Sequence, residues 1–266
     1  MSDPSPITVP DFVALKSAGQ KICMLTAYDY PTAALLDAAG IEGILVGDSL
    51  GMVVQGHATT LPVTLDQMIY HAEMVGRAVR RALVVVDLPF PLAALEPAEV
   101  VRSAARIFKE TLCRAVKLEG GAQQSQVIAA LVRAGMPVMA HCGLRPQNVH
   151  VLGGYKVQRA EQQLLADAQA AEAAGAFAIV LECIPSGIAQ RITAAVRVPT
   201  IGIGAGAECD GQVLVTPDLL GLTSGYVPRF VKAFGALGHA AAEAVQHYRD
   251  EVRSGTFPGP AHSFKG

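Results

Sequence analysis

The sequence predicts an α/β fold, a single (β/α)₈ TIM barrel made of eight strand–helix units. Short apolar runs recur along the chain, and an amphipathic stretch follows most of them. The runs are almost continuously apolar, which is typical of parallel strands that are covered on both faces. Eight units in 266 residues give about 33 residues each, close to the roughly 30 residues that a strand–helix–strand unit needs.

The strand positions follow from these apolar, often β-branched runs. No linker divides them, so we expect one domain over residues 1–266, with terminal arms at about 1–8 and 255–266. Periodicity alone also allows a doubly wound open sheet. The predicted strands are Ile22–Thr26, Gly43–Gly47, Leu83–Leu88, Ala115–Leu118, Pro137–His141, Ala178–Glu182, Pro199–Gly204 and Gln212–Val215.

Helical spacing of apolar residues predicts helices between the strands. Thr64-Leu65-Asp66-Gln67 has the pattern of a capping box, and Gly175 is placed to end a helix in the left-handed conformation. The segment after Gly204 is too short and glycine-rich for a full helix, so we expect one helix to be short or irregular. The predicted helices are one after Thr64 (Met68, Ala72, Val75, Val79), one after Glu96-Pro97 (Val100, Ala104, Phe108, Leu112), Ala160–Ala174, one from Ser186 (Ile188, Ile192, Ala195) and Phe234–Arg253.

Composition and charge exclude several classes of protein. Only 17% of the residues are charged and the net charge is −2, so a nucleic-acid partner, which demands a basic surface, is not expected. The five cysteines are scattered and never form C-x-x-C, which argues for a reduced, intracellular protein. The first residues lack the features of a signal peptide, and no apolar run reaches the about 20 residues of a membrane span.

Ionisable residues stand at the ends of five consecutive predicted strands. In a (β/α)₈ barrel the carboxyl ends of all strands meet on one face, where active sites are built. We therefore expect these side chains to converge in one barrel mouth. They are Asp48, Asp87, Lys117 with Glu119, His141 and Glu182.

Each of these residues, taken alone, also has a structural interpretation. An aspartate after a strand can cap the next helix, Lys117 and Glu119 can pair, and His141 can be a hydrogen-bonded core residue. Several buried carboxylates together, however, would repel one another unless something neutralised them. A divalent cation would do so. Oxygen ligands with open positions suit Mg²⁺, whereas no histidine and cysteine cluster has the spacing of a zinc site.

A glycine-rich segment, Gly202-Ile203-Gly204-Ala205-Gly206-Ala207, fits the G-x-G-x-x-G/A pattern of a dinucleotide-binding turn. Such a turn should open a helix early in a strand–helix unit. This segment instead follows the seventh of eight runs and leads into Glu208-Cys209-Asp210-Gly211. We therefore interpret it as a tight turn at a strand end, where glycine lets backbone or ligand approach closely.

The ionisable residues at the strand ends and the first five residues of the glycine-rich segment lie within ten motifs. By these motifs the sequence resembles the ketopantoate hydroxymethyltransferase family. The resemblance extends from about residue 6 to the His262-Ser263-Phe264 tail, and its one noted difference is Leu118, where the family often has isoleucine. The motifs are Leu25–Asp29, Val46–Met52, Gln55–His57, Thr60–Thr64, Asp87–Phe90, Val116–Gly121, His141–Gln147, Gly153–Gln158, Leu181–Pro185 and Ile201–Gly206.

The resemblance implies a Mg²⁺-dependent barrel of the phosphoenolpyruvate mutase and isocitrate lyase group, with one Mg²⁺ per subunit. It implies transfer of a hydroxymethyl group from 5,10-methylenetetrahydrofolate to 2-oxoisovalerate (3-methyl-2-oxobutanoate), which gives 2-dehydropantoate through a Mg²⁺-stabilised enolate. This is the first step of pantothenate and coenzyme A biosynthesis. The resemblance further implies a cytoplasmic homo-oligomer, a homodecamer.

Roles for individual residues follow from the same resemblance. Asp48 and Asp87 would hold Mg²⁺, and Glu119 would support it directly or through water. Glu182 would be the catalytic base that removes the C3 proton of the substrate. The implied substrate-binding residues are Asp48, Ser49, Asp87, Lys117 and His141.

Two rival interpretations stay open at the level of sequence. A carbon–carbon or phosphorus–carbon lyase of the same barrel group would share the Mg²⁺ and enolate chemistry. Such a lyase commonly carries a catalytic cysteine in a Lys-Lys-Cys-Gly-like segment, which this sequence lacks. A non-catalytic barrel would be expected to have lost some of the mouth carboxylates, all of which are present.

Overall fold

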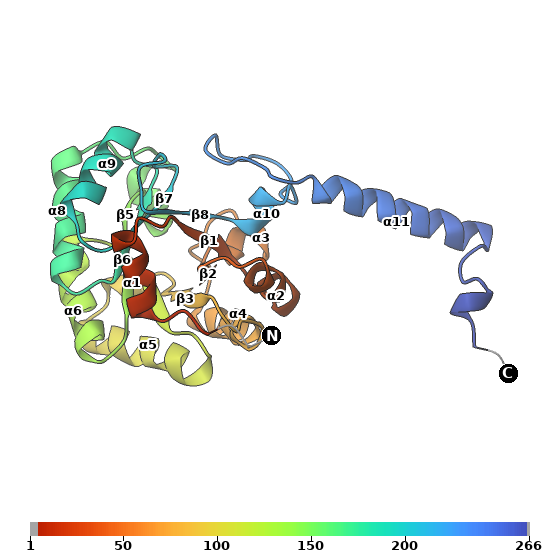
Figure 1. Cartoon of the computed structure of the whole chain (residues 1–266), viewed down its shortest axis with the longest axis horizontal. Helices are drawn as coiled ribbons and strands as arrows, with labels where there is room; N and C mark the ends of the chain where they lie inside the picture. Colours follow the sequence, from red (N-terminus) through yellow and green to blue (C-terminus); the bar gives the residue numbers. More distant parts are fainter. Residues whose placement is uncertain (1–4, 265–266) are drawn as a thin grey trace. The chain divides into compact units, whose positions relative to one another are not determined.

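The structure, a computed structural model, describes residues 5–264 and contains a closed barrel of eight parallel strands (Figure 1). The strands are β1 (Ile22–Thr26), β2 (Gly43–Val46), β3 (Leu83–Asp87), β4 (Ala115–Glu119), β5 (Val138–Gly143), β6 (Ala178–Glu182), β7 (Thr200–Ile203) and β8 (Gly211–Leu214). Because β1 pairs with both β2 and β8, the sheet closes on itself. The predicted fold class is therefore confirmed, and the open sheet is excluded.

Helices follow most of the strands and cover the barrel from outside (Figure 1). No helix lies between β7 and β8, so the expectation of one short or irregular unit is confirmed. The helices among the described residues are α1 (Val9–Ser17), α2 (Tyr30–Ala38), α3 (Leu50–Val53), α4 (Leu65–Ala78), α5 (Pro97–Glu110), α6 (Ser125–Arg133), α7 (Val149–Leu152), α8 (Glu161–Ala173), α9 (Ser186–Ala195), α10 (Thr216–Leu219) and α11 (Leu237–Ser254).

Local signals placed several helix ends correctly, but α1, α2 and α6 were not predicted, and the last helix begins at Leu237 and not at Phe234. The capping box of α4 is formed, since the Thr64 hydroxyl accepts from the Gln67 N–H and the Gln67 side chain accepts from the Thr64 N–H. Gly175 follows α8 with a φ of 98°, as a helix-ending glycine should. The predicted apolar face of α5 (Val100, Ala104, Phe108, Leu112) was wrong at its last residue, Leu112. That helix ends at Glu110, and Leu112 is exposed because it lies in the loop beyond the helix.

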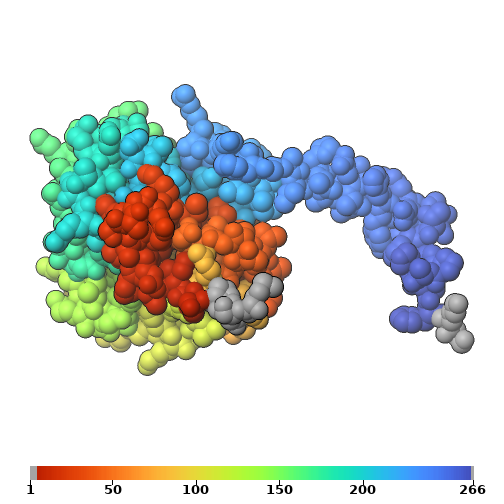
Figure 2. Space-filling view, viewed as in Figure 1, coloured from red at the N-terminus to blue at the C-terminus, as the bar shows by residue number. Residues whose placement is uncertain are grey.

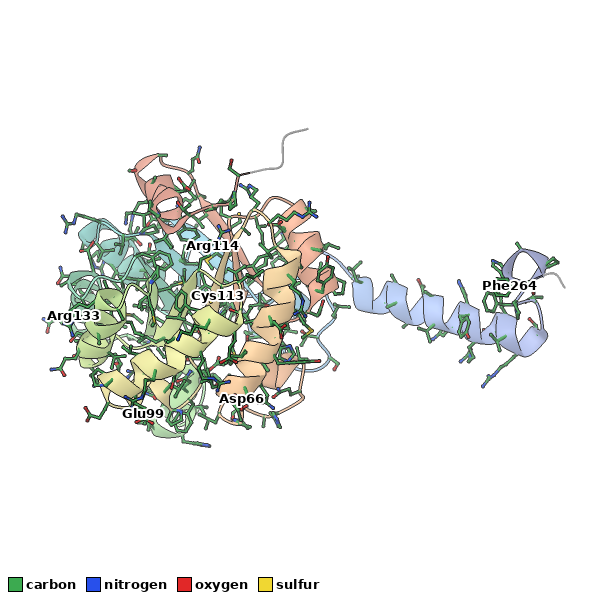
Figure 3. All side chains as sticks on the ribbon, turned by 90° about the horizontal axis from the view of Figure 1, so that it is seen from below. Asp66, Glu99, Cys113, Arg114, Arg133 and Phe264 are labelled. Atoms are coloured by element: carbon green, nitrogen blue, oxygen red, sulfur yellow. The ribbon has the colours of Figure 1, made fainter. Side chains whose placement is uncertain are left out.

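Two apolar cores stabilise the barrel. One fills the layer between the outer faces of the strands and the helices, and the other fills the barrel interior. Helix α1 contributes fully buried Phe12 to the interior core, where its ring meets Phe177 edge-on at 5.9 Å. Figure 2 shows this N-terminal segment, in red, lying across one face of the barrel. Charged side chains such as Asp66, Glu99 and Arg133 lie on the outer surface (Figure 3).

By internal packing the chain forms two compact units, one up to Val215 and the other from Thr216 onward. The second unit contains α10 and α11, and none of the residues of α11 is buried. After α11, Phe257 packs against Tyr248 at 5.6 Å, whereas Phe264 is fully exposed (Figure 3). The prediction of one domain stays a prediction, and residues 1–4 and 265–266 of its terminal arms lie outside the described residues.

No helix within residues 5–264 combines the length and apolar character that crossing a bilayer requires.

Candidate active site

The barrel interior changes from apolar to ionisable along its axis. Successive residues of a strand point to opposite faces, so residues two apart share a face. In β3 the buried inward residues Leu83 and Val85 lead to Asp87 in this way. Strands β4, β5 and β6 follow the same rule, and their carboxyl ends bring ionisable side chains to the same face. These are Lys117 and Glu119 of β4, His141 of β5 and Glu182 of β6.

A chain of short contacts links four of these residues. Lys117 Nζ lies 2.7 Å from Asp87 Oδ1 and 3.2 Å from His141 Nδ1. A lysine ammonium has only protons to give, so His141 Nδ1 accepts and the ring proton is assigned to Nε2. That nitrogen lies 3.2 Å from Glu182 Oε2, in a contact without the direction of a hydrogen bond. Lys117 thus pairs with Asp87, and its suggested pairing with Glu119 is not seen.

Asp48 and Ser49 enter the site from the loop after β2. The Asp48 backbone N–H donates to Asp87 Oδ2 at 3.0 Å, and the Ser49 hydroxyl lies 2.8 Å from the Tyr28 hydroxyl. Ser49, and not Asp48, stands at the N-cap position of α3, so Asp48 is no helix cap. Gly47 makes this turn possible, because a Cβ there would lie 2.9 Å from Ser49 Oγ.

Gln147 is a site residue that the sequence interpretation did not single out. Its side-chain Nε2 donates to Asp48 Oδ2 at 2.9 Å and to the Leu88 carbonyl at 3.0 Å. Its backbone N–H donates to Glu119 Oε2 at 3.0 Å. The residue lies in a motif of the family resemblance, but an uncharged amide carries no sign of such a role. Tyr28 was overlooked as well, because its side chain is also uncharged.

Burial and mutual repulsion shift the pKa values of the mouth residues. Burial, together with the Asp87 charge, raises the pKa of Asp48 to about 7. Burial and the Asp48 charge raise the pKa of Glu119 well above its ordinary value. Burial and the Lys117 ammonium lower the pKa of His141, so its ring is neutral at pH 7. Burial lowers the pKa of Lys117, but Asp87, Glu119 and Asp48 outweigh it and raise that pKa, so the ammonium stays charged.

The carboxylates at this mouth fit a divalent cation. Within residues 5–264 no three or more His, Cys, Asp or Glu side chains form a ready ligand set. Mg²⁺ does not need one, because it is usually held by one or two carboxylates, with water and substrate oxygens completing its shell. Asp48 and Asp87 supply two buried carboxylates, and the Asp48 backbone N–H donates to the Asp87 carboxylate. The raised pKa of Asp48 shows that its ionised form lacks enough positive charge nearby, which a cation would supply.

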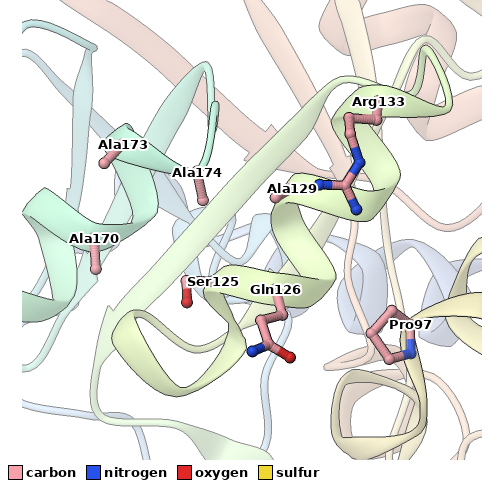
Figure 4. A pocket seen from close by; sticks show the side chains of 8 residues that line it. All are labelled: Pro97, Ser125, Gln126, Ala129, Arg133, Ala170, Ala173 and Ala174. Atoms are coloured by element: carbon pink, nitrogen blue, oxygen red, sulfur yellow. The ribbon is translucent and has the colours of Figure 1, made fainter.

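Two surface cavities lie outside this mouth. One lies between α5, α6 and α8 (Figure 4), and the other lies along α1 beside Arg197. Neither is lined by any predicted site residue. The barrel mouth is therefore the candidate active site on the grounds of its converging charges and contacts.

Comparison with known proteins identifies the family of the chain. The chain matches the family model described as ketopantoate hydroxymethyltransferase over residues 6–260. It belongs to the ketopantoate hydroxymethyltransferase family. A relative from Rhodopirellula baltica, named 3-methyl-2-oxobutanoate hydroxymethyltransferase, is 60% identical over 98% of this chain and 97% of its own length. A relative of that name from Moorella thermoacetica is 52% identical over the full length of both chains. The predicted family and transferase class are confirmed.

Solved structures of lower sequence identity share the fold of this hydroxymethyltransferase family member. Phosphonopyruvate hydrolase in complex with oxalate and Mg²⁺ aligns with a TM-score of 0.62 and 14% identity, over 96% of this chain and 93% of that one. A 2,3-dimethylmalate lyase of the PEP mutase/isocitrate lyase superfamily aligns with a TM-score of 0.60 and 18% identity, over 97% of this chain and 92% of that one. These alignments agree with the predicted TIM-barrel fold, and the predicted barrel group stays a prediction.

Proposed function

We propose that the chain transfers a hydroxymethyl group from 5,10-methylenetetrahydrofolate to 3-methyl-2-oxobutanoate and so forms 2-dehydropantoate. The observation that carries the proposal is the convergence of Asp87, Lys117, His141 and Glu182 in one mouth through contacts of 2.7 to 3.2 Å. Membership of the hydroxymethyltransferase family and the name of its relatives support the same reaction.

The chemical difficulty is the C3–H bond beside the keto group, which is not acidic at neutral pH. Glu182 would accept this proton, a role supported by its position at the end of β6 and by its being the most exposed of the mouth carboxylates. The neutral His141 ring holds its Nε2 toward Glu182 and, with the Ser49 hydroxyl, offers a hydrogen bond to the bound oxo acid. A positioned base of this kind contributes about 10²–10⁴-fold to the rate.

The Lys117 ammonium stabilises the negative charge that grows on the keto oxygen as the C3 proton leaves. It is suited to this because its pairing with Asp87 fixes it in place at 2.7 Å. Water adds to the methylene carbon of the folate, and both C–N bonds of that carbon break, which releases tetrahydrofolate and leaves the carbon at the formaldehyde level. The C3 carbanion then attacks this carbon, and the proton taken up from C3 is returned to the new alkoxide, which becomes the hydroxyl of the hydroxymethyl group.

Asp48 and Asp87 are the residues that would hold one Mg²⁺ per subunit, with Glu119 contributing directly or through water. When bound, the cation would supply Lewis-acid stabilisation of the charge on the keto oxygen. The two aspartates are assigned this role because both are buried, with the Asp48 backbone N–H donating to the Asp87 carboxylate, and because the pKa of Asp48 is raised to about 7.

The reaction is tested by a coupled assay for 2-dehydropantoate with and without EDTA. We expect product only when 3-methyl-2-oxobutanoate, methylenetetrahydrofolate and Mg²⁺ are all present. Absence of product under these conditions would overturn the proposal. Cleavage of an oxo acid without folate would instead favour the lyase of the same barrel group.

The metal assignment is tested separately by calorimetry with Mg²⁺. Asp48→Ala should weaken Mg²⁺ binding by at least about tenfold, since it removes a ligand and a negative charge. The control Asp66→Ala removes an exposed carboxylate from the surface of α4 and should leave binding unchanged. Equal affinity of Asp48→Ala and wild type would show that Asp48 does not hold the metal.

The assembly and location of the enzyme are further parts of the proposal. We propose a cytoplasmic homodecamer, in keeping with the family resemblance. Light scattering should then give ten times the chain mass of 27.7 kDa. The mass of a single chain would contradict it.

A further inference from the structure

We propose that Gln147 is a positioning residue that orients two mouth carboxylates, Asp48 through its side chain and Glu119 through its backbone. The inference rests on the proposed function to the extent that those carboxylates hold the cation. It assigns a role in the reaction to an uncharged residue from the loop after β5.

The side-chain amide of Gln147 is fixed by two hydrogen bonds. Gln147 is buried, and Nε2 donates one proton to the Leu88 carbonyl at 3.0 Å and the other to Asp48 Oδ2 at 2.9 Å. The Leu88 carbonyl belongs to the backbone just after β3, so it cannot rotate away. With both protons engaged, the amide plane has one orientation, and Asp48 is held by Oδ2 while Oδ1 stays clear of this donor.

The backbone of Gln147 acts on a second carboxylate. Its N–H donates to Glu119 Oε2 at 3.0 Å from the short 3₁₀ turn η3 (Pro146–Asn148). Pro146 begins this turn and fixes its own φ, which favours the conformation that aims the next N–H inward. One residue thereby links the carboxyl ends of β2, β3 and β4.

Glutamine suits this position because it donates without bringing a positive charge. A lysine beside Asp48 would neutralise the carboxylate and compete with a cation, whereas an amide leaves the negative charge available. The site already holds one buried ammonium, Lys117, and it pairs with Asp87. The two aspartates are therefore oriented by different means, Asp87 by a charged partner and Asp48 by a neutral one.

The test is Gln147→Met, which keeps the length of the side chain and removes both donors. The first measurement is Mn²⁺ binding to the purified full chain, followed by electron paramagnetic resonance. We expect the dissociation constant to rise by about 10-fold or more, as happens when partners of metal ligands are removed. The second is activity against Mg²⁺ concentration. Here half-maximal activity should move to higher Mg²⁺ while the maximal rate recovers to within about threefold of wild type.

The matched control is Gln163→Met. Gln163 Nε2 also donates to an aspartate, Asp167 Oδ1 at 3.0 Å, but it does so on the exposed surface of α8. This variant should bind Mn²⁺ and turn over as wild type does. If Gln147→Met does not fold, Gln147→Ala is measured in its place and should show the same weakened binding.

The outcomes separate the two proposals. An Mn²⁺ affinity within twofold of wild type for the folded Gln147 variant overturns the positioning role. So does a loss of maximal rate that saturating Mg²⁺ fails to restore, since that is the mark of a general structural defect. Wild-type chain that binds Mn²⁺ but makes no 2-dehydropantoate overturns the proposed function, and the binding comparison still decides on Gln147.

Discussion

The two ends of the barrel interior differ in the kind of residue that points inward, although the same alternation along the strands sets both. Toward the amino ends of the strands, the inward positions are apolar, as at Leu83 and Val85, and Phe12 of α1 packs into this core. Toward the carboxyl ends, the same strands present ionisable side chains such as Asp87 and Glu119, which are also buried. Burial stabilises the apolar end, because apolar surface leaves water. At the ionisable end burial is costly, because charge is desolvated.

At the barrel mouth, ion pairs and hydrogen bonds offset part of the cost of desolvating these charges. Lys117 lies against Asp87 and His141, and Gln147 donates to Asp48 and to Glu119. Asp48 nevertheless keeps a raised pKa of about 7, so the compensation is incomplete without further positive charge. Stability and chemistry are therefore separated along the barrel axis. Substitutions at the two ends should therefore separate activity from stability.

The largest effect is expected at the mouth, from Glu182→Gln. The substitution is nearly isosteric and removes the proposed base, so the rate should fall by about 10²–10⁴-fold. Exchange of the substrate C3 proton with solvent deuterium, followed by NMR, isolates this step from folate chemistry. Thermal stability should change little, because Glu182 is the most exposed of the mouth carboxylates.

Glu73→Gln is the matched control for this change. Glu73 lies on α4, half-exposed and paired with Arg77. Its variant should exchange the C3 proton at the wild-type rate. If Glu182→Gln also exchanged at that rate, Glu182 would not be the base, and the assignment of chemistry to this end of the barrel would need another residue.

At the apolar end, Phe12→Ala should give the opposite pattern. Phe12 is fully buried and contacts Phe177, so truncation leaves a cavity and should lower the free energy of unfolding by about 3–5 kcal/mol. The folded fraction should keep its KM and kcat, because the residue belongs to the interior core and not to the mouth. Urea unfolding and active-site titration measure the two quantities. A selective loss of kcat without loss of stability would contradict the separation.

The ionisable end should also make the stability of the metal-free protein depend on pH. The pKa of Asp48 rises from 3.8 to about 7 in the folded chain, so the folded state binds this proton more tightly than the unfolded state. Its contribution to stability is therefore present below pH 4 and is lost as the pH rises toward and through 7. Urea unfolding between pH 5 and 8 should show the free energy of unfolding falling, by on the order of 1–4 kcal/mol from this group.

Asp48→Asn provides the comparison that isolates this group. The variant carries no titratable carboxyl there, so its free energy of unfolding should fall less steeply over the same pH range. Added Mg²⁺ should stabilise the wild type more at pH 8 than at pH 5, because a cation binds the ionised carboxylates. Parallel pH profiles for wild type and variant would show that Asp48 is already ionised at pH 5 in the folded chain.

Much of this arrangement could be predicted from sequence for a definite physical reason. Strands β1 and β6 match the predicted ranges, because near-continuous apolar runs mark covered parallel strands. The meeting of Asp87 and Glu182 at one face follows from their places at strand ends. The partner of each side chain could not be predicted from its place at a strand end. Lys117 pairs with Asp87 and not with Glu119 because Asp87 lies opposite it on the neighbouring strand.

Gln147 shows the limit most clearly. It contacts Asp48 across 99 positions of sequence, and neither its charge nor its spacing marks it. The error at Leu112 has a different origin. An i, i+4 ladder identifies a helical face but not its last turn, and α5 ends at Glu110 before reaching that residue.

The smallest effect is expected where charges face water rather than the barrel interior. Arg106 of α5 pairs with Asp66 and Glu110 at 2.8 Å each, and all three side chains are largely exposed. Because solvent and salt screen such pairs, Arg106→Gln should shift Tm by less than about 3 °C and leave kcat unchanged. The shift should shrink further in about 1 M NaCl, where the screening length is near 3 Å. A larger loss of Tm, persisting in high salt, would contradict the expectation that these exposed ion pairs add little to the stability of the fold.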